Sequence, residues 1–307
     1  MKKFITAMIM VTVTVLVTGV NLRYGYGSGT DSDKPILKLD TGGHMALMRK
    51  VIPMKDGRHI ITCSDDKTIR IWDTVTGEEN AKILGQIGAG SEGKIFAIAL
   101  TPDEQYLAVG GFLAGESLED KTAIRIYDLK TGKIVRILKS HEDVVFDLSV
   151  SSDGRYLVSA SGDYTVKVWD IRNDFSCVHT FEGHSDDVYA ARIFKNDSDY
   201  RIVSAGYDNR VILWSLSEKK MLREYAHADK LDSLAMSSRY IAASGFDNSI
   251  LIFDRDLNYL RSIESETVPA GLAFSPDGKL LLAGVGAPPP VCNIYDTSKD
   301  FVKITSF

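Results

Sequence analysis

The segment Val166-Lys-Val-Trp-Asp170 (VKVWD) decides the fold, because it is one of six copies of a single pattern. In each copy, side chains alternate as in a β-strand, and an aromatic residue near the end is usually followed by Asp. The other five copies are IRIWD at Ile69–Asp73, IRIYD at Ile124–Asp128, VILWS at Val211–Ser215, ILIFD at Ile250–Asp254 and CNIYD at Cys292–Asp296.

The spacing of these copies indicates a repeat architecture. Their aromatic residues are 55, 42, 45, 39 and 42 residues apart. A period of about 40–45 residues that carries an alternating strand is typical of four-stranded propeller blades. Turn signals such as Ser152-Asp153-Gly154 and Ser275-Pro276-Asp277-Gly278 separate the strands. We therefore predict an all-β fold, a single β-propeller over residues 36–307.

Composition and charge narrow the function classes. The 307 residues are 44% hydrophobic and 25% charged, as in ordinary soluble globular proteins. The net charge of −5 argues against a nucleic-acid binder, which would carry a basic face. Three widely separated cysteines are too few for a disulfide framework.

The N-terminus reads as a targeting segment. Lys2 and Lys3 precede an uncharged apolar run, Phe4–Val20, which is the layout of a secretory signal cleaved after Gly19. At 17 residues the run is also at the low end of a membrane span, so an uncleaved anchor stays open. We expect a signal or anchor at 1–19, a flexible linker at 20–35 and an exported protein, periplasmic or secreted. Membrane contact would then occur only through an uncleaved N-terminus.

Gly-His steps such as Gly43-His44 and Gly183-His184 open several units. Together with the strand and turn motifs, they resemble the WD-repeat β-propeller family. With the N-terminal segment, the resemblance is to a bacterial, exported form of that family. The resemblance implies a buried tetrad of His, Ser or Thr, Asp and Trp in three units. In each, the hydroxyl residue precedes Asp by four positions and Asp precedes Trp by six. The implied tetrads are His44, Thr62, Asp66 and Trp72; His141, Ser159, Asp163 and Trp169; and His184, Ser204, Asp208 and Trp214.

Two features depart from the family pattern. The fifth unit keeps His227 and Asp247 but has Ala243 and Phe253, so its tetrad is predicted to be incomplete. Six units are evident, whereas seven blades are common in the family. The ring is therefore either six-bladed or an incomplete seven-bladed ring, and a truncated targeting domain of a larger effector protein is one alternative.

No motif indicates catalysis. The Gly-rich stretch 88–94 leads into a strand, where a phosphate-binding loop needs a helix, so we expect no nucleotide cofactor. The histidines lack metal-ligand spacing, and no metal or other cofactor is predicted. We predict a non-enzyme. An exported propeller enzyme of the lactonase or hydrolase type is the alternative, with Asp187, Asp232 and Arg49 as its weak candidates.

The resemblance places partner binding on the face that carries the turn before each tetrad Asp and the start of each innermost strand. Aromatic residues and Arg, which are enriched at interface hot spots, gather at these positions. We predict a protein or peptide partner; Phe96 and Phe146 could instead pack between blades. The predicted binding residues are Arg49, Phe96, Phe146, Tyr189, Tyr207 and Phe246.

An insertion in the second unit, Phe112–Asp120, is expected on the same face. It is either a tolerated surface loop or an arm that docks a partner.

Overall fold

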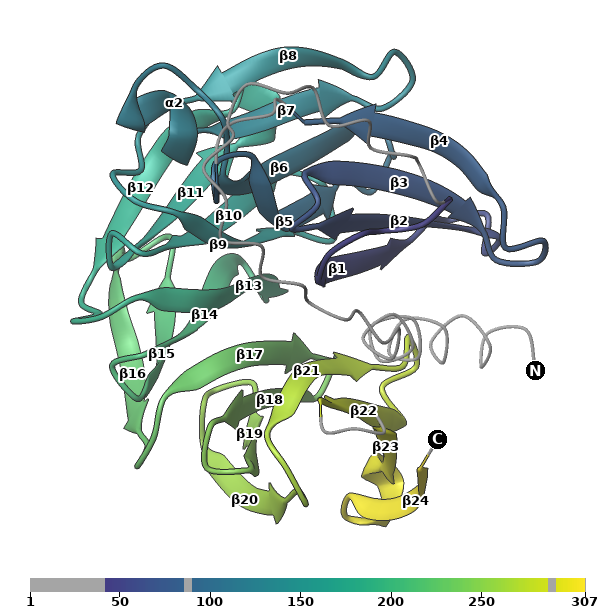
Figure 1. Cartoon of the computed structure of the whole chain (residues 1–307). Coiled ribbons are helices and arrows are strands. Elements are labelled where there is room, and N and C mark those ends of the chain that lie inside the picture. The colour runs from purple at the N-terminus through teal and green to yellow at the C-terminus, as the bar shows by residue number, and fades with distance from the viewer. Residues whose placement is uncertain (1–41, 86–89, 287–290, 307) are drawn as a thin grey trace, which may run out of the picture.

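The structure of the protein, a computed structural model, describes residues 42–85, 90–286 and 291–306. These residues form six antiparallel four-stranded sheets, each built from four consecutive strands. Figure 1 shows the sheets arranged as blades around a common axis. The predicted all-β propeller with six blades is confirmed.

The blades follow one another along the chain, and each begins at the axis and ends at the rim. Blade 1 holds β1 (Met48–Pro53), β2 (His59–Ser64), β3 (Thr68–Asp73) and β4 (Glu79–Leu84); blade 2 holds β5 (Lys94–Leu100), β6 (Tyr106–Phe112), β7 (Ile124–Asp128) and β8 (Lys133–Leu138). Blade 3 holds β9 (Val145–Val150), β10 (Tyr156–Ser161), β11 (Thr165–Asp170) and β12 (Ser176–Glu182); blade 4 holds β13 (Val188–Asn196), β14 (Asp199–Gly206), β15 (Arg210–Ser215) and β16 (Lys220–Ala226). Blade 5 holds β17 (Leu231–Met236), β18 (Tyr240–Gly245), β19 (Ser249–Asp254) and β20 (Tyr259–Glu264); blade 6 holds β21 (Pro269–Phe274), β22 (Leu280–Val285), β23 (Val291–Asp296) and β24 (Val302–Ser306).

The core lies between neighbouring blades, because both faces of the middle strands are apolar. One cluster joins Val203 and Leu213 of blade 4 to Leu234 and Phe253 of blade 5. Another joins Val158 of blade 3 to residues of blade 4. Burial of the two sheet faces thus requires a blade on each side, which is the physical reason that repeats of this kind stack.

The ring has an opening between its first and last blades. Packing of innermost strands runs from β1 through β5, β9, β13 and β17 to β21. Within the described ranges, no packing of comparable extent joins β21 to β1, and Figure 1 shows these two strands apart. The six blades therefore occupy an arc rather than a closed circle.

Some predictions concern residues that the structure does not describe. The signal or anchor at 1–19, the linker at 20–35 and the start of the propeller domain at 36–41 lie outside the described residues. In the described part of the chain, the helices are all too short or too polar to cross a membrane.

Candidate interaction face

Every innermost strand contains a β-bulge at the same place near its start. The register of β1 shifts between Met48 and Lys50, so that Arg49 is the additional residue, and the other five blades repeat this shift. A bulge re-aims the side chain that it carries, and bulges are common beside functional sites. The bulged residues, in blade order, are Arg49, Phe96, Phe146, Tyr189, Asp232 and Ala270.

The other two predicted binding residues come from turns that reach the same level. Tyr207 and Phe246 each precede an Asp, and the residue after that Asp is held in the left-handed region, with φ of 66° at Asn209 and 64° at Asn248. The amide of Tyr207 donates to the carbonyl of Asp187 at 2.8 Å, two positions before the bulge of the same blade. The amide of Phe246 makes the equivalent bond to Lys230 at 3.0 Å. Turn and bulge are thus joined, which positions their side chains together.

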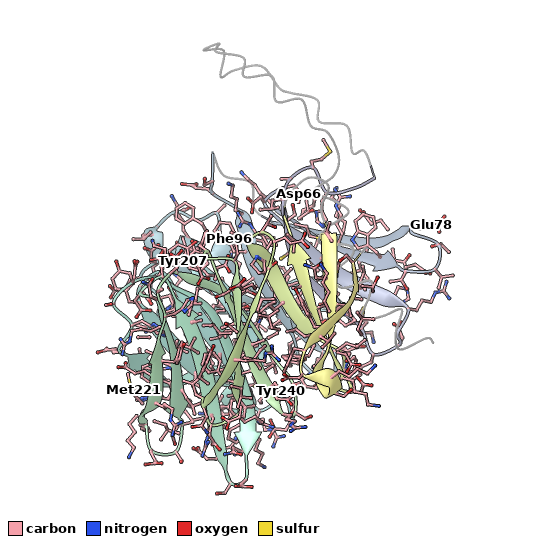
Figure 2. All side chains as sticks on the ribbon, turned by 90° about the horizontal axis from the view of Figure 1, so that it is seen from below. Asp66, Glu78, Phe96, Tyr207, Met221 and Tyr240 are labelled. Carbon is pink, nitrogen blue, oxygen red and sulfur yellow. The ribbon has the colours of Figure 1, made fainter. Side chains whose placement is uncertain are left out.

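The five aromatic side chains form one continuous row. Phe96 lies 6.1 Å from Phe146, Phe146 lies 4.2 Å from Tyr189, and Tyr189 lies 4.0 Å from Tyr207, all measured between the centroids of stacked rings. Phe246 closes the row edge-on to Tyr207 at 5.7 Å. Figure 2 shows Phe96 and Tyr207 at the same end of the strands as Asp66, with Tyr240 toward the opposite end.

A cation lies over a ring toward each end of this aromatic row. The Arg49 guanidinium is 4.7 Å from the centre of the Phe96 ring, and the Lys230 ammonium is 4.4 Å from that of Tyr207. The structure therefore brings all six predicted binding residues together. Phe96 and Phe146 were alternatively expected to pack between blades. They do contact each other across two blades, and these contacts are part of the aromatic row.

Charges are unevenly distributed along the row. At the blade 1 end, Nε and Nη2 of Arg49 donate to the two carboxylate oxygens of Asp65, at 2.6 and 2.8 Å, and Lys94 approaches the same carboxylate at 3.6 Å. At the other end, burial and the charges of Asp186 and Asp143 raise the pKa of Asp187. Basic groups are thus paired at one end, while carboxylates crowd at the other.

Asp232 occupies the bulge position in blade 5, where blades 2, 3 and 4 have aromatic residues. Burial raises the pKa of Asp232 to about 6. Its Oδ1 atom is buried and has no hydrogen-bond partner among the described residues. Burial also raises the pKa of Tyr207, and the neighbouring Tyr189, Asp232 and Asp187 raise it further. The acidic side chains therefore share one environment with the row.

The three implied tetrads form as buried hydrogen-bond networks. In blade 4, His184 Nδ1 lies 2.9 Å from Asp208, His184 Nε2 lies 2.8 Å from Ser204 Oγ, and the indole of Trp214 donates to that hydroxyl at 2.8 Å. Blades 1 and 3 repeat these contacts with spacings of 2.6–3.0 Å. All twelve predicted tetrad residues are therefore in place.

The proton arrangement of a tetrad follows from its donors and acceptors. Burial lowers the pKa of His141, so the ring is neutral at pH 7. Nδ1–H then donates to Asp163, the Ser159 hydroxyl donates to Nε2, and the indole of Trp169 donates to the hydroxyl oxygen. This connectivity matches that of a hydrolase triad, yet Ser159 has no exposed surface, so a substrate cannot reach the hydroxyl. The tetrad is structural.

Blade 5 shows the predicted incomplete tetrad. His227 Nε2 contacts Asp247 at 2.8 Å, but Ala243 and Phe253 stand fully buried where the hydroxyl and the indole would be. An apolar pair thus replaces a polar pair, and no polar group is left unsatisfied at these two positions.

A buried ionic cluster in the channel was not anticipated from the sequence. Asp147 of β9 accepts hydrogen bonds from Lys50 of β1 and Arg192 of β13, and the amide of Ala191 donates to it at 3.1 Å. Burial disfavours the carboxylate, but Arg192 and Lys50 outweigh burial and lower the pKa of Asp147. Charged residues inside otherwise apolar innermost strands were the available signal.

The insertion of blade 2 is held against the propeller. Its C-terminal part forms the short helix α2 (Leu118–Thr122), which Ser117 caps by accepting from the amide of Asp120. Lys139 pairs with Asp120 at 2.7 Å, and Lys121 pairs with Glu92. The insertion is therefore held in a fixed position with Leu118 exposed, and its role as an arm that docks a partner stays a prediction.

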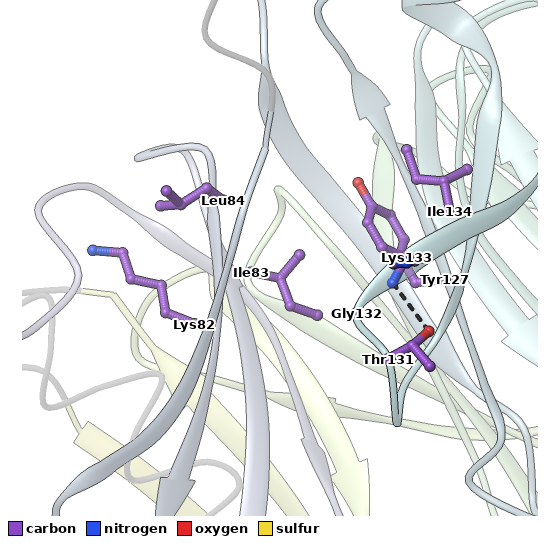
Figure 3. A pocket seen from close by; sticks show the side chains of 8 residues that line it. All are labelled: Lys82, Ile83, Leu84, Tyr127, Thr131, Gly132, Lys133 and Ile134. Carbon is purple, nitrogen blue, oxygen red and sulfur yellow. Dashed lines mark hydrogen bonds between the residues drawn. The ribbon is translucent and has the colours of Figure 1, made fainter.

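A shallow groove separates the outer strands of blades 1 and 2 (Figure 3). Ile83 and Leu84 line one side, and Tyr127 and Ile134 the other. Its polar lining residues are Lys82, Lys133, Thr131 and Tyr127, and no carboxylate is among them. Across the described ranges, no three His, Cys, Asp or Glu side chains are grouped as metal ligands would be.

The model of the family described as "WD domain, G-beta repeat" matches residues 36–73, 132–170 and 175–215. These three segments contain all the tetrad residues of blades 1, 3 and 4. In these three segments the chain is similar to WD repeats, and the propeller fold and the three tetrads agree with that similarity.

The curated relatives are longer proteins. Human apoptotic protease-activating factor 1 is 26% identical over 58% of this chain and 16% of its own length. The ribosome biogenesis protein WDR12 homolog of Trichoplax adhaerens is 34% identical over 56% of this chain and 37% of its own length. The nuclear distribution protein PAC1 of Arthroderma benhamiae is 30% identical over 44% of this chain and 32% of its own length. The chain thus spans well under half the length of these relatives.

A solved structure supports the fold. The chain described as "Structure of U3-55K" superposes with a TM-score of 0.73 at 20% identity, over 86% of this chain and 82% of that one. The relatives named above are all eukaryotic, so they give no support to the expected bacterial, exported form of the family.

Proposed function

We propose that the protein is a non-catalytic interaction scaffold or sensor that binds a protein or peptide partner through the aromatic row. The observation that carries this proposal is the row itself: five aromatic rings in unbroken contact, with Arg49 at one end and Lys230 at the other. Tyr and Arg in a rigid setting supply contact area at low entropic cost.

The rigid setting supports binding. Each side chain of the row stands on a bulge or a turn that backbone hydrogen bonds hold, so little freedom is lost when a partner docks. Phe246 is 43% exposed, and Arg49 is also exposed, which leaves apolar and cationic surface for contact. The names of the relatives describe protease activation, ribosome biogenesis and nuclear distribution. These are roles of those longer proteins, and we do not assign them to this chain.

We further propose that the protein acts outside the cytoplasm, on the basis of the basic start and apolar run at residues 2–20. Intact mass of the protein recovered from fractions of its source cells tests this. A form beginning at Val20 in the fraction outside the cytoplasm would support export, and an intact form in the cytoplasm would contradict it.

Affinity capture from extracts of the source tests the binding function. The wild type is compared with Arg49→Ala/Tyr207→Ala/Phe246→Ala, and with Val302→Ala/Ile304→Ala as a control. The control removes apolar side chains that are 58% and 55% exposed on β24. We expect a protein held by the wild type and the control but reduced at least tenfold for the row variant, because hot-spot residues dominate binding.

Thermal denaturation establishes that all three proteins are folded before capture. A partner held equally by the row variant would contradict the proposed face. If the folded wild type turns over a lactone or ester and captures no partner, the exported-enzyme alternative replaces this proposal.

A further inference from the structure

The charge pattern of the row indicates the chemistry of its partner. Blades 2, 3 and 4 present aromatic rings at the bulge position, whereas blade 5 presents Asp232. One oxygen of Asp232 is buried and accepts no hydrogen bond from the described residues. A buried carboxylate oxygen without a donor is costly, since both its hydration and its compensating bond are missing. A donor that arrives with a ligand would remove that cost.

The carboxylates beside the row outweigh the cation that faces them. Lys230 favours ionisation of Asp187, but burial and the charges of Asp186 and Asp143 have the larger effect and raise the pKa of Asp187. Within the described ranges, Asp143 and Asp186 accept hydrogen bonds only from the backbone amides that follow them, at 2.6 and 2.8 Å. Asp187 stands close enough to both for their charges to oppose its ionisation. Among the described residues, none of these three carboxylates has a basic side chain within ion-pairing distance. At the opposite end of the row, Arg49 and Lys94 share one ion-pair partner, Asp65, so that end keeps an excess of positive charge.

The aromatic surface between these acids already holds a cation. One face of the Tyr207 ring stacks on Tyr189, and Lys230 places its ammonium 4.4 Å from the centre of the Tyr207 ring. A ring of this kind attracts a cation electrostatically, and more strongly where water is excluded. The site therefore combines a π surface with carboxylates, which is the chemistry that recognises a basic side chain rather than an acidic one.

We propose that this end of the row receives an arginine or lysine side chain of the partner, between Asp187 and Asp232 and beside Tyr207. The inference rests on the proposed function and names the chemistry of the segment bound. The ligand cation would donate to Asp232, relieve the crowding of Asp143, Asp186 and Asp187, and lie beside the Tyr207 ring, over which Tyr189 and Lys230 already pack. The rings from Phe96 to Tyr189 would then contact the apolar part of the same segment.

Small probes test this chemistry without a known partner. N-acetyl-arginine N-methylamide is compared with its citrulline analogue, which has nearly the same shape and no charge, and with the glutamate analogue. Binding to the protein is followed by ligand-observed NMR at low salt. We expect the arginine probe to bind at least tenfold more tightly than the citrulline probe, and the glutamate probe to bind more weakly than both.

Charge-neutral variants locate the effect. In Asp187→Asn/Asp232→Asn the advantage of arginine over citrulline should fall below threefold. The control Asp256→Asn/Asp300→Asn removes two charges from side chains that are 62% and 85% exposed, each paired with an arginine. This control has the same net charge as the test variant but keeps Asp187 and Asp232. It should therefore keep the full preference for the arginine probe over the citrulline probe.

Each outcome decides the inference. Equal binding of arginine and citrulline, tighter binding of glutamate, or an equal loss in both variants would overturn it. If capture yields a partner that the row variant loses but the probes show no preference for arginine, this inference falls and the proposed function stands. If arginine binds as expected and capture yields no partner, the site stands and the proposed function falls.

Discussion

The buried carboxylate of Asp232 lowers the stability of the fold at neutral pH, although we propose that it serves binding. A carboxylate at the bulge of β17 is held away from water, and its pKa is raised to about 6. Between the ordinary pKa of an aspartate, about 4, and the folded value, the unfolded chain releases a proton that the folded protein keeps. Stability therefore falls as pH rises through this window and stays reduced above it. A residue that weakens the fold at neutral pH is a candidate for binding rather than for structure.

We expect Asp232→Asn to stabilise the protein at pH 8, by about 1–3 kcal/mol, because the amide carries no charge to bury. At pH 4 the gain should vanish, since the wild-type carboxyl is protonated in the folded state. Urea denaturation at pH 4, 5, 6, 7 and 8 measures the difference. A gain that does not depend on pH would show that the carboxylate charge is not responsible.

At the scale of elements, a blade is held by the way its second and third strands join. In blades 1, 3 and 4 a hydroxyl on the second strand bonds both a histidine and the indole of the third strand. In blade 5 the equivalent positions are Ala243 and Phe253, and both are fully buried. The two solutions are alternatives, because each leaves no polar group unpaired at the junction of the strands.

We expect Ser204→Ala to destabilise the protein by about 1–3 kcal/mol, because the Trp214 indole and His184 Nε2 lose their partner inside the core. The reciprocal change, Ala243→Ser, should also destabilise, since it adds a hydroxyl beside Phe253, which has no donor to offer it. Urea midpoints of both variants measure the effect. Stabilisation by Ala243→Ser would mean that polar and apolar junctions are interchangeable.

At the scale of the molecule, the opening between blades 1 and 6 leaves blade 1 with one neighbouring blade among the described residues. Lys50 of blade 1 compensates by reaching across the channel to Asp147 of blade 3, where it also donates to the carbonyl of Leu148 at 3.0 Å. Arg192 adds blade 4 to the same carboxylate. One buried Asp thus joins three blades that strand pairing does not connect.

We expect Asp147→Ala to cost about 3 kcal/mol, the low end of the range for a buried ion pair, because it leaves two partly buried cations without their counter-ion. Asp256→Ala breaks an exposed ion pair with Arg201 and should cost less than about 1 kcal/mol. Denaturant unfolding of the two variants makes the comparison. Equal costs would mean that the channel cluster does not hold the ring together.

Local pattern was sufficient for the blades and for much of the interaction face. Strand alternation ending in an aromatic residue, as in VKVWD, is dictated by burial of a sheet face and is visible without any partner strand. Positions such as Tyr207, just before a tetrad Asp, follow from turn chemistry that lies within a few residues. The resemblance to WD repeats placed these positions at one end of the propeller.

The amino-acid sequence alone determined the all-β propeller and its strands, because strand alternation and turn chemistry depend on residues close together in the chain. The residues of the tetrads were implied by the resemblance to WD repeats. Only the tertiary structure decided that five rings make one continuous row, that Lys50 meets Asp147 from 97 residues away, and that the insertion is pinned. It also decided the environment of Asp232. Such features depend on how bulges aim side chains and on which blades face one another across the channel, and both arise only when the blades have packed.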